Sequence, residues 1–477
     1  MQLHSSYMAH GLAEYLTGIA GAGRPSGATQ FRHLCSQVKR YVDDIITAEH
    51  AESDYGTEVQ RNALMGKPDA VRYFTGMVNK YLHEHVHEGV EYPSCHTSLV
   101  EAVYHEVWGY SVLASWFVDK ECQSAKVIGE RVYYLINGRQ KMQNFTIPKE
   151  RREQLINALL LNTPQKTRNT PYVEMNLLTG ERITLFNRNV TAQGQDVIVL
   201  RKYTVQRYTW EEMAKRGTVD PASLPLMKSF CTVGFNVLFT GPVRSGKTTM
   251  LETWQAYEDA TLEGVSIEAT DEIKFHRLMP GSPIMSLLSN EEDISDVIRP
   301  VLRSDADYLV LAEARTGAEF DLMIRLANKG TNRCKTTMHS THVRELVYDI
   351  ADEVLTVRPN AKYETLLFKV ASAYHYVVQL ASEYNDKAQK RLMGIYEICP
   401  DRQNNTISMW KICAYDTASG TWKWSFHVGE DKRELARTEN YPDFLTFLDE
   451  LKKMEGRSPL AQEDARIAVY GGQRDYA

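Results

Sequence analysis

The spacing of apolar positions changes along the chain and divides it into five segments. Residues 1–95 place aromatic and aliphatic side chains at helix-compatible intervals among charged ones, which predicts a helical extension. Residues 96–205 mix helical patterns with strand-like runs and predict an α+β domain. Residues 206–235 predict a linker and a helix, and 236–415 alternate short apolar strands with helices, as in a parallel sheet covered by helices. Residues 416–477 predict a C-terminal tail that ends in a polar, loose segment.

The composition limits the classes of function. The 55 Lys and Arg residues against 61 Asp and Glu give a formal charge of −6, so we expect no stable nucleic-acid binding. No apolar run reaches the ~18 residues of a spanning helix, and the apolar stretch at 8–23 lacks a cationic leader, so we expect only peripheral membrane contact. The seven cysteines form no CxxC pair, which favours a reducing compartment and a cytoplasmic location.

One motif carries specific chemistry. The strand pattern FNVLFT runs into GPVRSGKTTMLETW, where Gly241, Gly246, Lys247 and Thr248 fill the fixed positions of the phosphate-binding pattern G-x-x-x-x-G-K-[ST]. The glycines let backbone N–H groups face one point at the positive end of the next helix, and the Thr248 hydroxyl suits a magnesium ion. A Gly-rich turn with a solvated lysine is the alternative. The predicted nucleotide loop comprises Gly241, Pro242, Val243, Arg244, Ser245, Gly246, Lys247, Thr248 and Thr249, with Thr248 as the metal ligand.

Hydrolysis of a bound nucleotide needs acidic groups beside the magnesium ion and the attacking water. Two glutamates are placed for this. Glu268 follows the buried strand pattern at 265–267, and Glu313 follows the apolar run at 308–312, so both should emerge at carboxyl ends of strands. Either glutamate alone could be an ordinary helix-cap or surface carboxylate. Their succession after a phosphate loop favours the catalytic interpretation.

The order of these segments resembles a known family. GPVRSGKTT, SIEATDE, DADYLVLAEARTGAEFD and TTMHSTHVREL together resemble the secretion ATPase superfamily of type II and type IV secretion systems and type IV pili, with the nearest likeness to the CpaF-like branch of tight-adherence pili. The likeness covers about residues 99–415. It implies an α/β fold, in which a RecA-like P-loop NTPase motor domain is preceded by an α+β amino-terminal domain and, here, by the helical extension. It also implies ATP and Mg²⁺ as bound groups.

The resemblance also assigns roles to single residues. Glu268 matches the glutamate of the family's Asp-box region, Glu313 matches the Walker B glutamate, and His339 matches the His-box histidine. Family members clamp the γ-phosphate with arginines from the amino-terminal domain or linker, and Arg201 is our first candidate for that role, with Arg207 second. The predicted catalytic set is therefore Glu268, Glu313, His339 and Arg201. Arg315 also matches a family arginine, with a structural or coupling role.

The chain departs from the family pattern at a few neighbouring positions, namely Ala269, Ala312, Ser340 and Thr341. Ala269 stands where the family usually has an aspartate, and its loss could weaken the organisation of the metal unless Asp271 or Glu272 replaces it. None of the departures removes an indispensable charge. Hydrolysis could nevertheless be slow.

These observations support three hypotheses. The first is an Mg-dependent ATPase that drives pilus assembly or secretion, working as a hexameric ring on inner-membrane platform proteins at the cytoplasmic face of the membrane. The second is a nucleotide-binding scaffold of the same machine with little or no hydrolysis. The third, a P-loop kinase for a small molecule, is disfavoured because the sequence has no recognisable acceptor lid. The machine, its cargo and the role of residues 1–95 stay open.

A few other features are assigned to structure rather than function. The alternating His83, His85 and His87 could suit zinc or nickel, but no nearby fourth ligand supports this, and we interpret them as polar surface. We interpret Cys334 as structural and His342 as a bystander. The tail tryptophans are expected mainly in the core; they are Trp410, Trp422 and Trp424.

Overall fold

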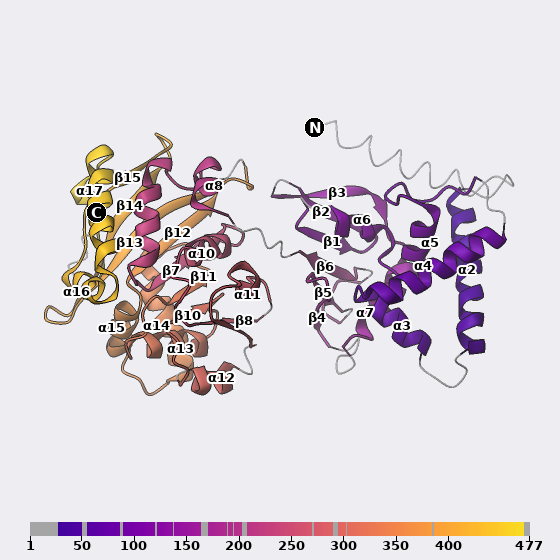
Figure 1. Ribbon diagram of the computed structural model, residues 1–477, viewed down its shortest axis with the longest axis horizontal. Helices are drawn as coiled ribbons and strands as arrows, with labels where there is room; N and C mark the ends of the chain where they lie inside the picture. Colours follow the sequence, from indigo (N-terminus) through magenta and orange to yellow (C-terminus); the bar gives the residue numbers. More distant parts are fainter. Residues whose placement is uncertain are drawn as a thin grey trace. The chain divides into compact units, whose positions relative to one another are not determined.

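A computed structural model provides the fold of the chain (Figure 1). It describes residues 27–49, 55–85, 89–119, 122–136, 138–163, 170–187, 189–193, 195–202, 208–269, 271–289, 294–301, 303–383 and 386–471. The chain divides into two compact units: Met1–Ile136 with Gln140–Lys202, and Tyr203–Ala477 with Asn137–Arg139. Among the described residues, no helix is both long and apolar enough to cross a membrane.

The first unit begins with helices that share one apolar core. Phe31, Val38 and Val42 on one helix, and Phe74 and Val78 on another, recur at helical spacing and are fully or almost fully buried. Trp108 follows the last of these helices, and its ring stacks on that of Phe74. The helices are α2 Gly27–Glu49, α3 Tyr55–Leu64, α4 Pro68–Glu84 and α5 Leu99–Val107.

The same unit contains an antiparallel sheet with the strand order β3-β2-β1-β6-β5-β4. Its strands alternate buried and exposed side chains, because only one face packs against the unit's core. The strands are β1 Ser124–Ile128, β2 Arg131–Ile136, β3 Arg139–Thr146, β4 Tyr172–Asn176, β5 Arg182–Phe186 and β6 Val197–Arg201. Helix α7 Lys149–Leu160 follows β3, and the short elements η1 Ser111–Leu113 and α6 Ala114–Val118 precede β1.

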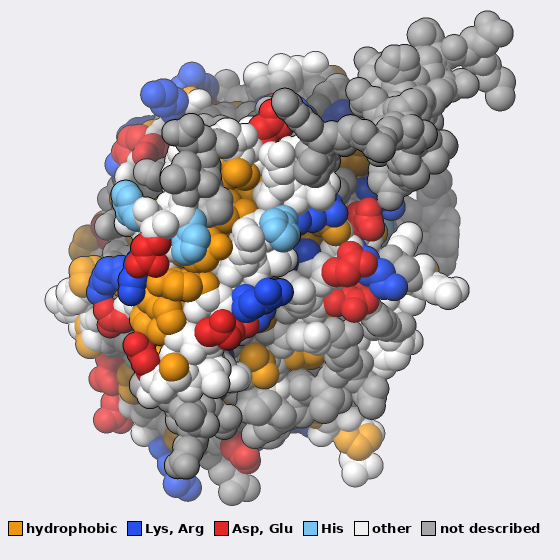
Figure 2. Space-filling view, turned by 90° about the vertical axis from the view of Figure 1, so that its right-hand side faces the viewer, with side chains coloured by type: hydrophobic (Ala, Val, Ile, Leu, Met, Phe, Trp, Pro, Cys, Tyr) orange, Lys and Arg blue, Asp and Glu red, His pale blue; other side chains and the backbone are white. Residues whose placement is uncertain are grey.

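The surface of the first unit is mixed in character. One of its faces carries hydrophobic side chains gathered beside Lys, Arg, Asp and Glu side chains (Figure 2). Helices α2 and α4 of this unit bury apolar residues along one side, as amphipathic helices do.

The second unit is built on a ten-stranded mixed sheet of described residues, with the order β15-β14-β13-β12-β7-β11-β10-β8-β9 and β16 paired with β14. The strands from β12 to β9 run parallel, and β13, β14 and β15 continue the sheet in antiparallel pairing. The strands are β7 Val237–Thr240, β8 Gly264–Glu268, β9 Ile284–Leu288, β10 Tyr308–Leu311, β11 Lys335–Met338, β12 Tyr376–Ser382, β13 Lys390–Asp401, β14 Thr406–Asp416, β15 Thr421–Trp424 and β16 Arg466–Tyr470.

Helices cover both faces of this sheet. Because successive residues of a strand point to opposite faces, Val237 and Phe239 of β7 belong to one apolar cluster, whereas Leu238 belongs to the other. The predicted helix after Thr209 is present, with the expected capping box between Thr209 and Glu212. The helical elements are α8 Trp210–Lys215, η2 Pro221–Ser223, α9 Leu224–Thr232, α10 Lys247–Gln255, α11 Phe275–Leu278, α12 Ile294–Val301, α13 Gly317–Ala327, η3 Val343–Glu345, α14 Leu346–Val357, α15 Tyr363–Ala373, α16 Glu430–Glu439, α17 Tyr441–Arg457 and α18 Gln462–Ala465.

The C-terminal tail forms helices and a strand up to Tyr470, and its polar end, residues 472–477, for which a loose segment is predicted, lies outside the described residues. Helix α17 packs against α9 and buries Phe444, Phe447 and Leu451, and β16 pairs with β14 in the main sheet. The spacing of Phe444, Phe447 and Leu451 is itself a helix signal in the sequence, whereas their burial depends on a distant partner. The tail tryptophans Trp422 and Trp424 are buried, as predicted.

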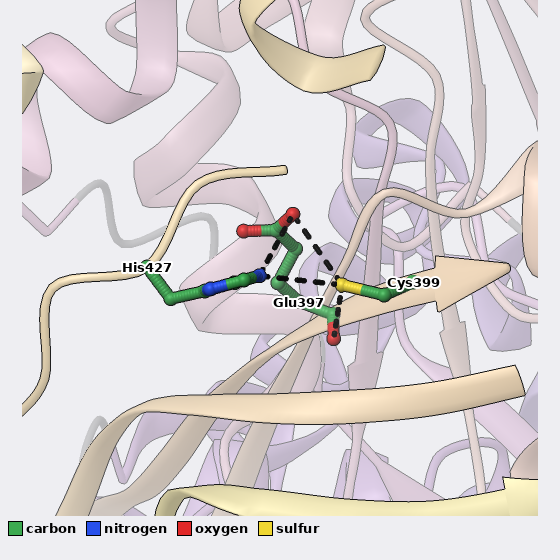
Figure 3. Close-up of side chains that lie close together, drawn as sticks. All are labelled: Glu397, Cys399 and His427. Atoms are coloured by element: carbon green, nitrogen blue, oxygen red, sulfur yellow. Dashed lines mark hydrogen bonds and ion pairs between the residues drawn. The ribbon is translucent and has the colours of Figure 1, made fainter. Parts of the chain in front are cut away.

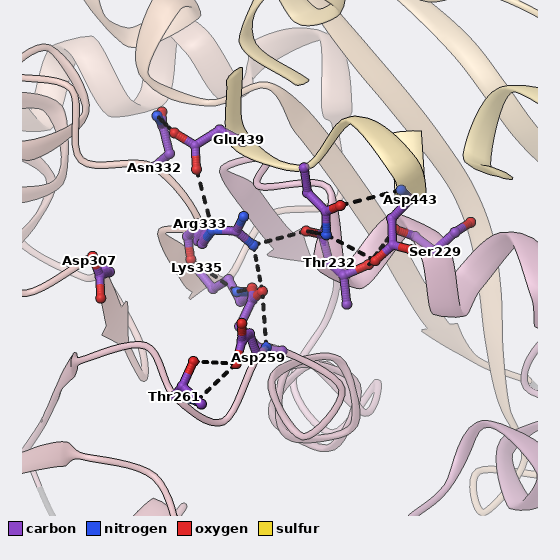
Figure 4. Close-up of polar contacts among 12 residues, drawn as sticks. Ser229, Thr232, Asp259, Thr261, Asp307, Asn332, Arg333, Lys335, Glu439 and Asp443 are labelled. Carbon is purple, nitrogen blue, oxygen red and sulfur yellow. Dashed lines mark hydrogen bonds and ion pairs between the residues drawn. The ribbon is translucent and has the colours of Figure 1, made fainter. Parts of the chain in front are cut away.

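A buried ion network ties these C-terminal helices to the start of β11 (Figure 4). The Glu258 carboxylate, which lies in the bend after α10, accepts hydrogen bonds from Arg333 Nη1 at 2.6 Å and Lys335 Nζ at 2.9 Å. Arg333 Nε lies 3.4 Å from Glu439 Oε2 at the end of α16. Thr232 at the end of α9 donates to Asp443 of α17 at 2.5 Å. The amino ends of the parallel strands are therefore held by paired charges.

Candidate functional site at the carboxyl ends of the parallel strands

The phosphate-loop motif lies between a buried strand and a helix, as the sequence predicts. Strand β7 is buried along its whole length between β11 and β12, so the loop after it emerges between these two strands. Helix α10 begins at Lys247, directly after the loop. Backbone N–H groups of the loop and of the first turn of α10 can therefore face one point, which favours an anion there.

Glycine is required at both ends of this loop. Gly241 has φ 144°, and a Cβ atom on it would lie 2.1 Å from the backbone oxygen of Leu380 in β12. Gly246 has φ 93° and caps the N-terminus of α10 in the left-handed region. Arg244, although not a glycine, also has a positive φ of 64°. The loop backbone is thus wound tightly against the sheet.

Lys247 is folded back over its own loop. Its Nζ donates to the backbone oxygens of Gly241 at 3.0 Å and Pro242 at 2.9 Å, and lies 2.9 Å from His339 Nδ1. Burial lowers the pKa of Lys247 to about 8, against the opposing charge of Glu313. An anionic ligand would restore the preference for the charged ammonium.

The predicted site residues follow the order of the strands in the sheet. Strands β7, β11, β10 and β8 are successive neighbours. His339 comes just after β11, Glu313 lies two residues beyond β10, and Glu268 ends β8. Parallel strands end at one edge of the sheet, so residues far apart along the chain meet there. One pocket is lined by Thr248, Glu268, Ala269, Glu272, Ala312, Glu313, Arg315 and Glu319.

A chain of polar contacts crosses this edge. His339 Nε2 lies 2.9 Å from Glu313 Oε1, and Arg315 Nη2 donates to Glu313 Oε2 at 2.6 Å. Because the Lys247 ammonium can only donate, His339 Nδ1 accepts from it and the ring proton sits on Nε2, facing Glu313. Burial and the Lys247 charge lower the pKa of His339, which keeps the ring in this neutral form.

Glu313 stays ionised in this arrangement. Burial alone raises its pKa, but the hydrogen bond from Arg315, with the charges of Arg315 and Lys247, outweighs burial and holds the pKa below its ordinary value. Its side chain is only 24% exposed. A carboxylate of this kind can accept a proton or orient a water molecule.

Glu268 has the opposite character. Its Oε2 accepts from the backbone N–H groups of Glu272 at 2.9 Å and Ile273 at 3.0 Å, whereas its buried Oε1 has no hydrogen-bond partner among the described residues. Burial raises the pKa of Glu268 to about 7, and burial together with Glu268 and Glu272 raises that of Glu252 in α10 to about 8. The pocket and the adjoining helix α10 therefore carry carboxyl groups whose pKa values are raised toward neutral pH.

The residues present fit a nucleoside triphosphate with magnesium. The glycine-wound loop leaves no room for a Cβ at Gly241, and the hydroxyl of Ser245 in the loop is buried without a hydrogen-bond partner among the described residues. Thr248 and several carboxylates, the oxygen ligands that Mg²⁺ prefers, line the adjacent pocket. Phosphate on the loop and metal beside Thr248 are thus compatible with this donor set.

Comparison with known proteins identifies the family. A family model described as "Type II/IV secretion system protein" matches residues 173–418, more than half of the chain. The chain belongs to this type II/IV secretion family. The predicted superfamily and the predicted fold class are thereby confirmed, whereas the CpaF-like branch stays a prediction.

Individual relatives are distant. An uncharacterized protein of Methanocaldococcus jannaschii is 23% identical over 150 residues, which are 31% of this chain and 55% of that protein, so the chain spans about half the length of the curated relative it matches. Solved structures are also similar to this chain, among them the following three. The VirB11 ATPase of the Brucella suis type IV secretion system, crystallised with sulphate, is 19% identical over 60% of this chain and 95% of that one, with a TM-score of 0.33.

The other two solved structures cover slightly more of the chain. The pilus retraction motor PilT with bound ADP is 14% identical over 72% of this chain and 92% of that one, with a TM-score of 0.42. The Legionella pneumophila ATPase DotB is 14% identical over 72% and 90%, with a TM-score of 0.41.

In this member of the secretion family, the two arginines predicted as a phosphate clamp belong to the end of the first unit and to the segment after it. Arg201 is exposed at the end of β6 in the first unit, and Arg207 lies outside the described residues. Their role as a phosphate clamp stays a prediction. Of the two acidic residues considered as substitutes for the missing aspartate at Ala269, Glu272 lines the pocket.

Sequence reasoning missed two acidic residues of this secretion family protein. Glu319 lines the pocket and caps α13, where its Oε2 accepts from the backbone N–H groups of Arg315 at 2.7 Å and Thr316 at 2.9 Å. The signal was present, since Thr316 and Glu319 have the spacing of a capping box. Glu252 had no signal of this kind, because its neighbours Glu268 and Glu272 are distant in sequence.

Proposed function

We propose that this protein is an ATP-hydrolysing motor of a secretion or pilus machine. The observation that carries the proposal is the row of contacts from Lys247 through His339 to Glu313, which joins the phosphate loop to an acidic pocket containing Thr248 and Glu268. A loop that only binds nucleotide does not require ionisable groups connected in this way.

Each residue of the site has a proposed role that follows from its position. Lys247 would exchange its contacts with the carbonyls of Gly241 and Pro242 for phosphate oxygens, while the loop N–H groups hold the phosphates. A magnesium ion at Thr248 would neutralise charge that develops on the phosphates. When Lys247 turns toward phosphate, His339 Nδ1 loses its donor, so His339 can register an occupied loop and pass this to Glu313.

The two strand-end glutamates would have different tasks. Glu313, ionised and held from both sides, would orient the attacking water. Glu268, whose pKa of about 7 matches the operating pH of a general base, would accept the proton that this water releases. We include Arg201 as a candidate γ-phosphate clamp, as in the resemblance.

The assembly is also part of the proposal. We infer a hexameric ring that works peripherally at the cytoplasmic face of a membrane, on platform proteins of the machine, and we place it in the CpaF-like branch. Support comes from family membership and from the motif resemblance. Size measurement of the full chain with and without a non-hydrolysable ATP analogue tests the ring.

Phosphate release from Mg-ATP tests the enzymatic claim directly. We expect Lys247→Ala to lower the rate at least ~100-fold, and the exposed Lys329→Ala of the same unit to leave it unchanged. Because a ring could be required, each variant is assayed above and below the assembly concentration. Equal rates from wild type and Lys247→Ala would remove the proposal.

A nucleotide-binding scaffold is the second candidate. Ala269 is exposed beside Glu268 and supplies no carboxylate where the family usually has one. Tight ATP binding by wild type that Lys247→Ala abolishes, together with no turnover in the assembled state, would favour the scaffold. Turnover would instead show that Glu272 or its neighbours organise the metal well enough for hydrolysis without an aspartate at position 269.

A further inference from the structure

A second group of chemically distinctive side chains lies away from the phosphate loop, on the antiparallel side of the sheet (Figure 3). Glu397 and Cys399 are two residues apart on β13, so they point to the same face of the strand. His427 comes from the segment between β15 and α16 and faces them. A carboxylate, a thiol and an imidazole therefore converge from two segments.

The three ligand atoms lie at distances that suit one small ion. Cys399 Sγ is 3.6 Å from His427 Nε2 and 3.6 Å from Glu397 Oε1, and Nε2 is 4.0 Å from Oε1. With zinc–sulfur bonds of about 2.3 Å and zinc–nitrogen or zinc–oxygen bonds of about 2.0 Å, tetrahedral geometry places sulfur about 3.5 Å from its neighbours. Only the nitrogen–oxygen edge must shorten, by about 0.7 Å on the same basis.

The arrangement differs from that of a catalytic relay. In a nucleophile–histidine–acid relay the two partners contact different ring nitrogens. Here both Cys399 Sγ and Glu397 Oε1 approach the same atom, His427 Nε2. Convergence on a single point is typical of metal ligands.

Surrounding groups hold the ligands in place. The His427 ring stacks on Trp410 of β14, with centroids 4.2 Å apart and an interplanar angle of 11°. Glu397 Oε1 accepts from the Gly429 N–H at 2.7 Å, and Oε2 accepts from the Tyr376 hydroxyl at 3.2 Å. Each oxygen keeps a further lone pair, so these contacts orient the carboxylate and still leave it able to bind a metal ion.

The local charges are compatible with a divalent ion. The buried Lys432 ammonium donates to Asp431 Oδ2 and to the Ile398 backbone oxygen, both at 2.6 Å. Lys432 and Asp431 thus compensate one another, and a Zn²⁺ ion with the Cys399 thiolate and the Glu397 carboxylate is neutral overall.

We propose that Glu397, Cys399 and His427 form a zinc site. Sulfur and nitrogen ligands favour Zn²⁺ over Mg²⁺, which prefers an all-oxygen shell. The His427 side chain is 26% exposed, which leaves the fourth position accessible to water. The ion would join β13 to the segment that leads into α16 and would stabilise the attachment of the C-terminal helices.

Cobalt spectroscopy of the full-length, reduced, chelator-treated protein without nucleotide tests the site. We expect Co²⁺ to give a thiolate-to-cobalt charge-transfer band and tetrahedral d–d bands, both removed by added Zn²⁺ but not by Mg²⁺. A thiolate band distinguishes this site from the acidic pocket at Glu268, which contains no cysteine. Absence of the band in wild type would overturn the proposal without touching the proposed function.

Matched variants assign the ligands. We expect Cys399→Ser to abolish the charge-transfer band and to lower Zn²⁺ affinity in calorimetry at least ~100-fold, and His427→Gln to act similarly. The half-buried Cys95 of the first unit provides the control, and Cys95→Ser should leave both signals unchanged. A band that persists in Cys399→Ser would place the metal elsewhere and refute the assignment. Circular dichroism of each variant confirms that it is folded.

Discussion

The two ends of the parallel strands in the second unit use the same chemical groups in opposite ways. At the amino ends, the Glu258 carboxylate is enclosed by Arg333 and Lys335, and both side-chain oxygens are hydrogen-bonded. At the carboxyl ends, Glu268 is equally buried but keeps one oxygen without a hydrogen-bond partner among the described residues. One edge is therefore electrostatically complete and the other is not.

This difference teaches how to separate structural from functional carboxylates. A buried charge whose partners are all supplied by the fold has nothing left to offer a ligand. A buried carboxyl group with a raised pKa and an unused acceptor oxygen is kept in this unfavourable environment by the rest of the fold. Such a group gains the most interaction energy when a ligand binds beside it. The predictions below test whether stability resides at one edge and activity at the other.

The largest effect should come from the complete edge. Glu258→Gln leaves the ammonium of Lys335 and the guanidinium of Arg333 buried around a neutral amide, and we expect a loss of about 3–5 kcal/mol in the free energy of unfolding. Denaturant unfolding measures it, with the exposed Glu434→Gln as control. A loss below that of the control would mean that this network is not a source of stability.

At the carboxyl ends of the strands, a substitution should lower activity more than stability. Glu313→Gln removes the charge that faces His339 and Arg315, and we expect the ATPase rate to fall about 100-fold or more, with a small change in unfolding free energy. Steady-state kinetics and thermal unfolding of the same preparations give both values. The exposed Glu345→Gln is the control. A variant that is strongly destabilised but active would reverse the comparison.

The pH dependence of stability should come from the acidic side of the pocket. The pKa of Glu252 is raised by burial and by Glu268 and Glu272 from 4.5 to about 8, so the folded state retains a proton that the unfolded state loses in this window. Stability is therefore greatest below about pH 4.5 for this group and is lost as the pH rises to about 8.

Substitution of this residue isolates its contribution. Glu252→Gln keeps a neutral group at every pH, and we expect its stability relative to wild type to rise by about 3–4 kcal/mol between pH 5 and pH 8. Thermal unfolding at both values measures the difference. An equal stability difference between the variant and wild type at pH 5 and pH 8 would show that ionisation of the Glu252 carboxyl group does not destabilise the folded state.

The smallest effect should be at the rim of the complete edge. Glu439 is 27% exposed and its Oε2 lies 3.4 Å from Arg333 Nε, so solvent screens the pair. We expect Glu439→Gln to cost about 0.5–1 kcal/mol of unfolding free energy. A loss as large as that of Glu258→Gln would mean that the outer pair, rather than the inner one, secures α16 to β11.

Local patterns predicted the central elements well. The apolar runs before Gly241, Glu268 and Glu313 are strands β7, β8 and β10, and each is buried along its length, because a strand covered on both faces needs a continuous apolar run. The capping box at Thr209 is also as predicted. These signals are local, and they are strong where a few consecutive residues determine the backbone conformation.

The C-terminal region was predicted less well for a definite reason. Helix α17 carries apolar residues at helical spacing, but the helix that buries them, α9, lies some 200 residues earlier in the chain. Cys399 and His427 carried no signal together, because their 28-residue separation matches no ligand spacing and only the turn of the chain after β15 brings them together. Glu397 and Cys399 alone, two apart on a strand, could have been noted.

The amino-acid sequence determined the phosphate loop, because glycine conformations and a lysine at fixed spacing are properties of a few consecutive residues. Only the tertiary structure decided that His339 lies between Lys247 and Glu313, and that Glu268 and Glu252 share one acidic neighbourhood. Strand order and the pKa of a buried group depend on which distant segments pack together, and pairing across a sheet is set by the packing of the whole core.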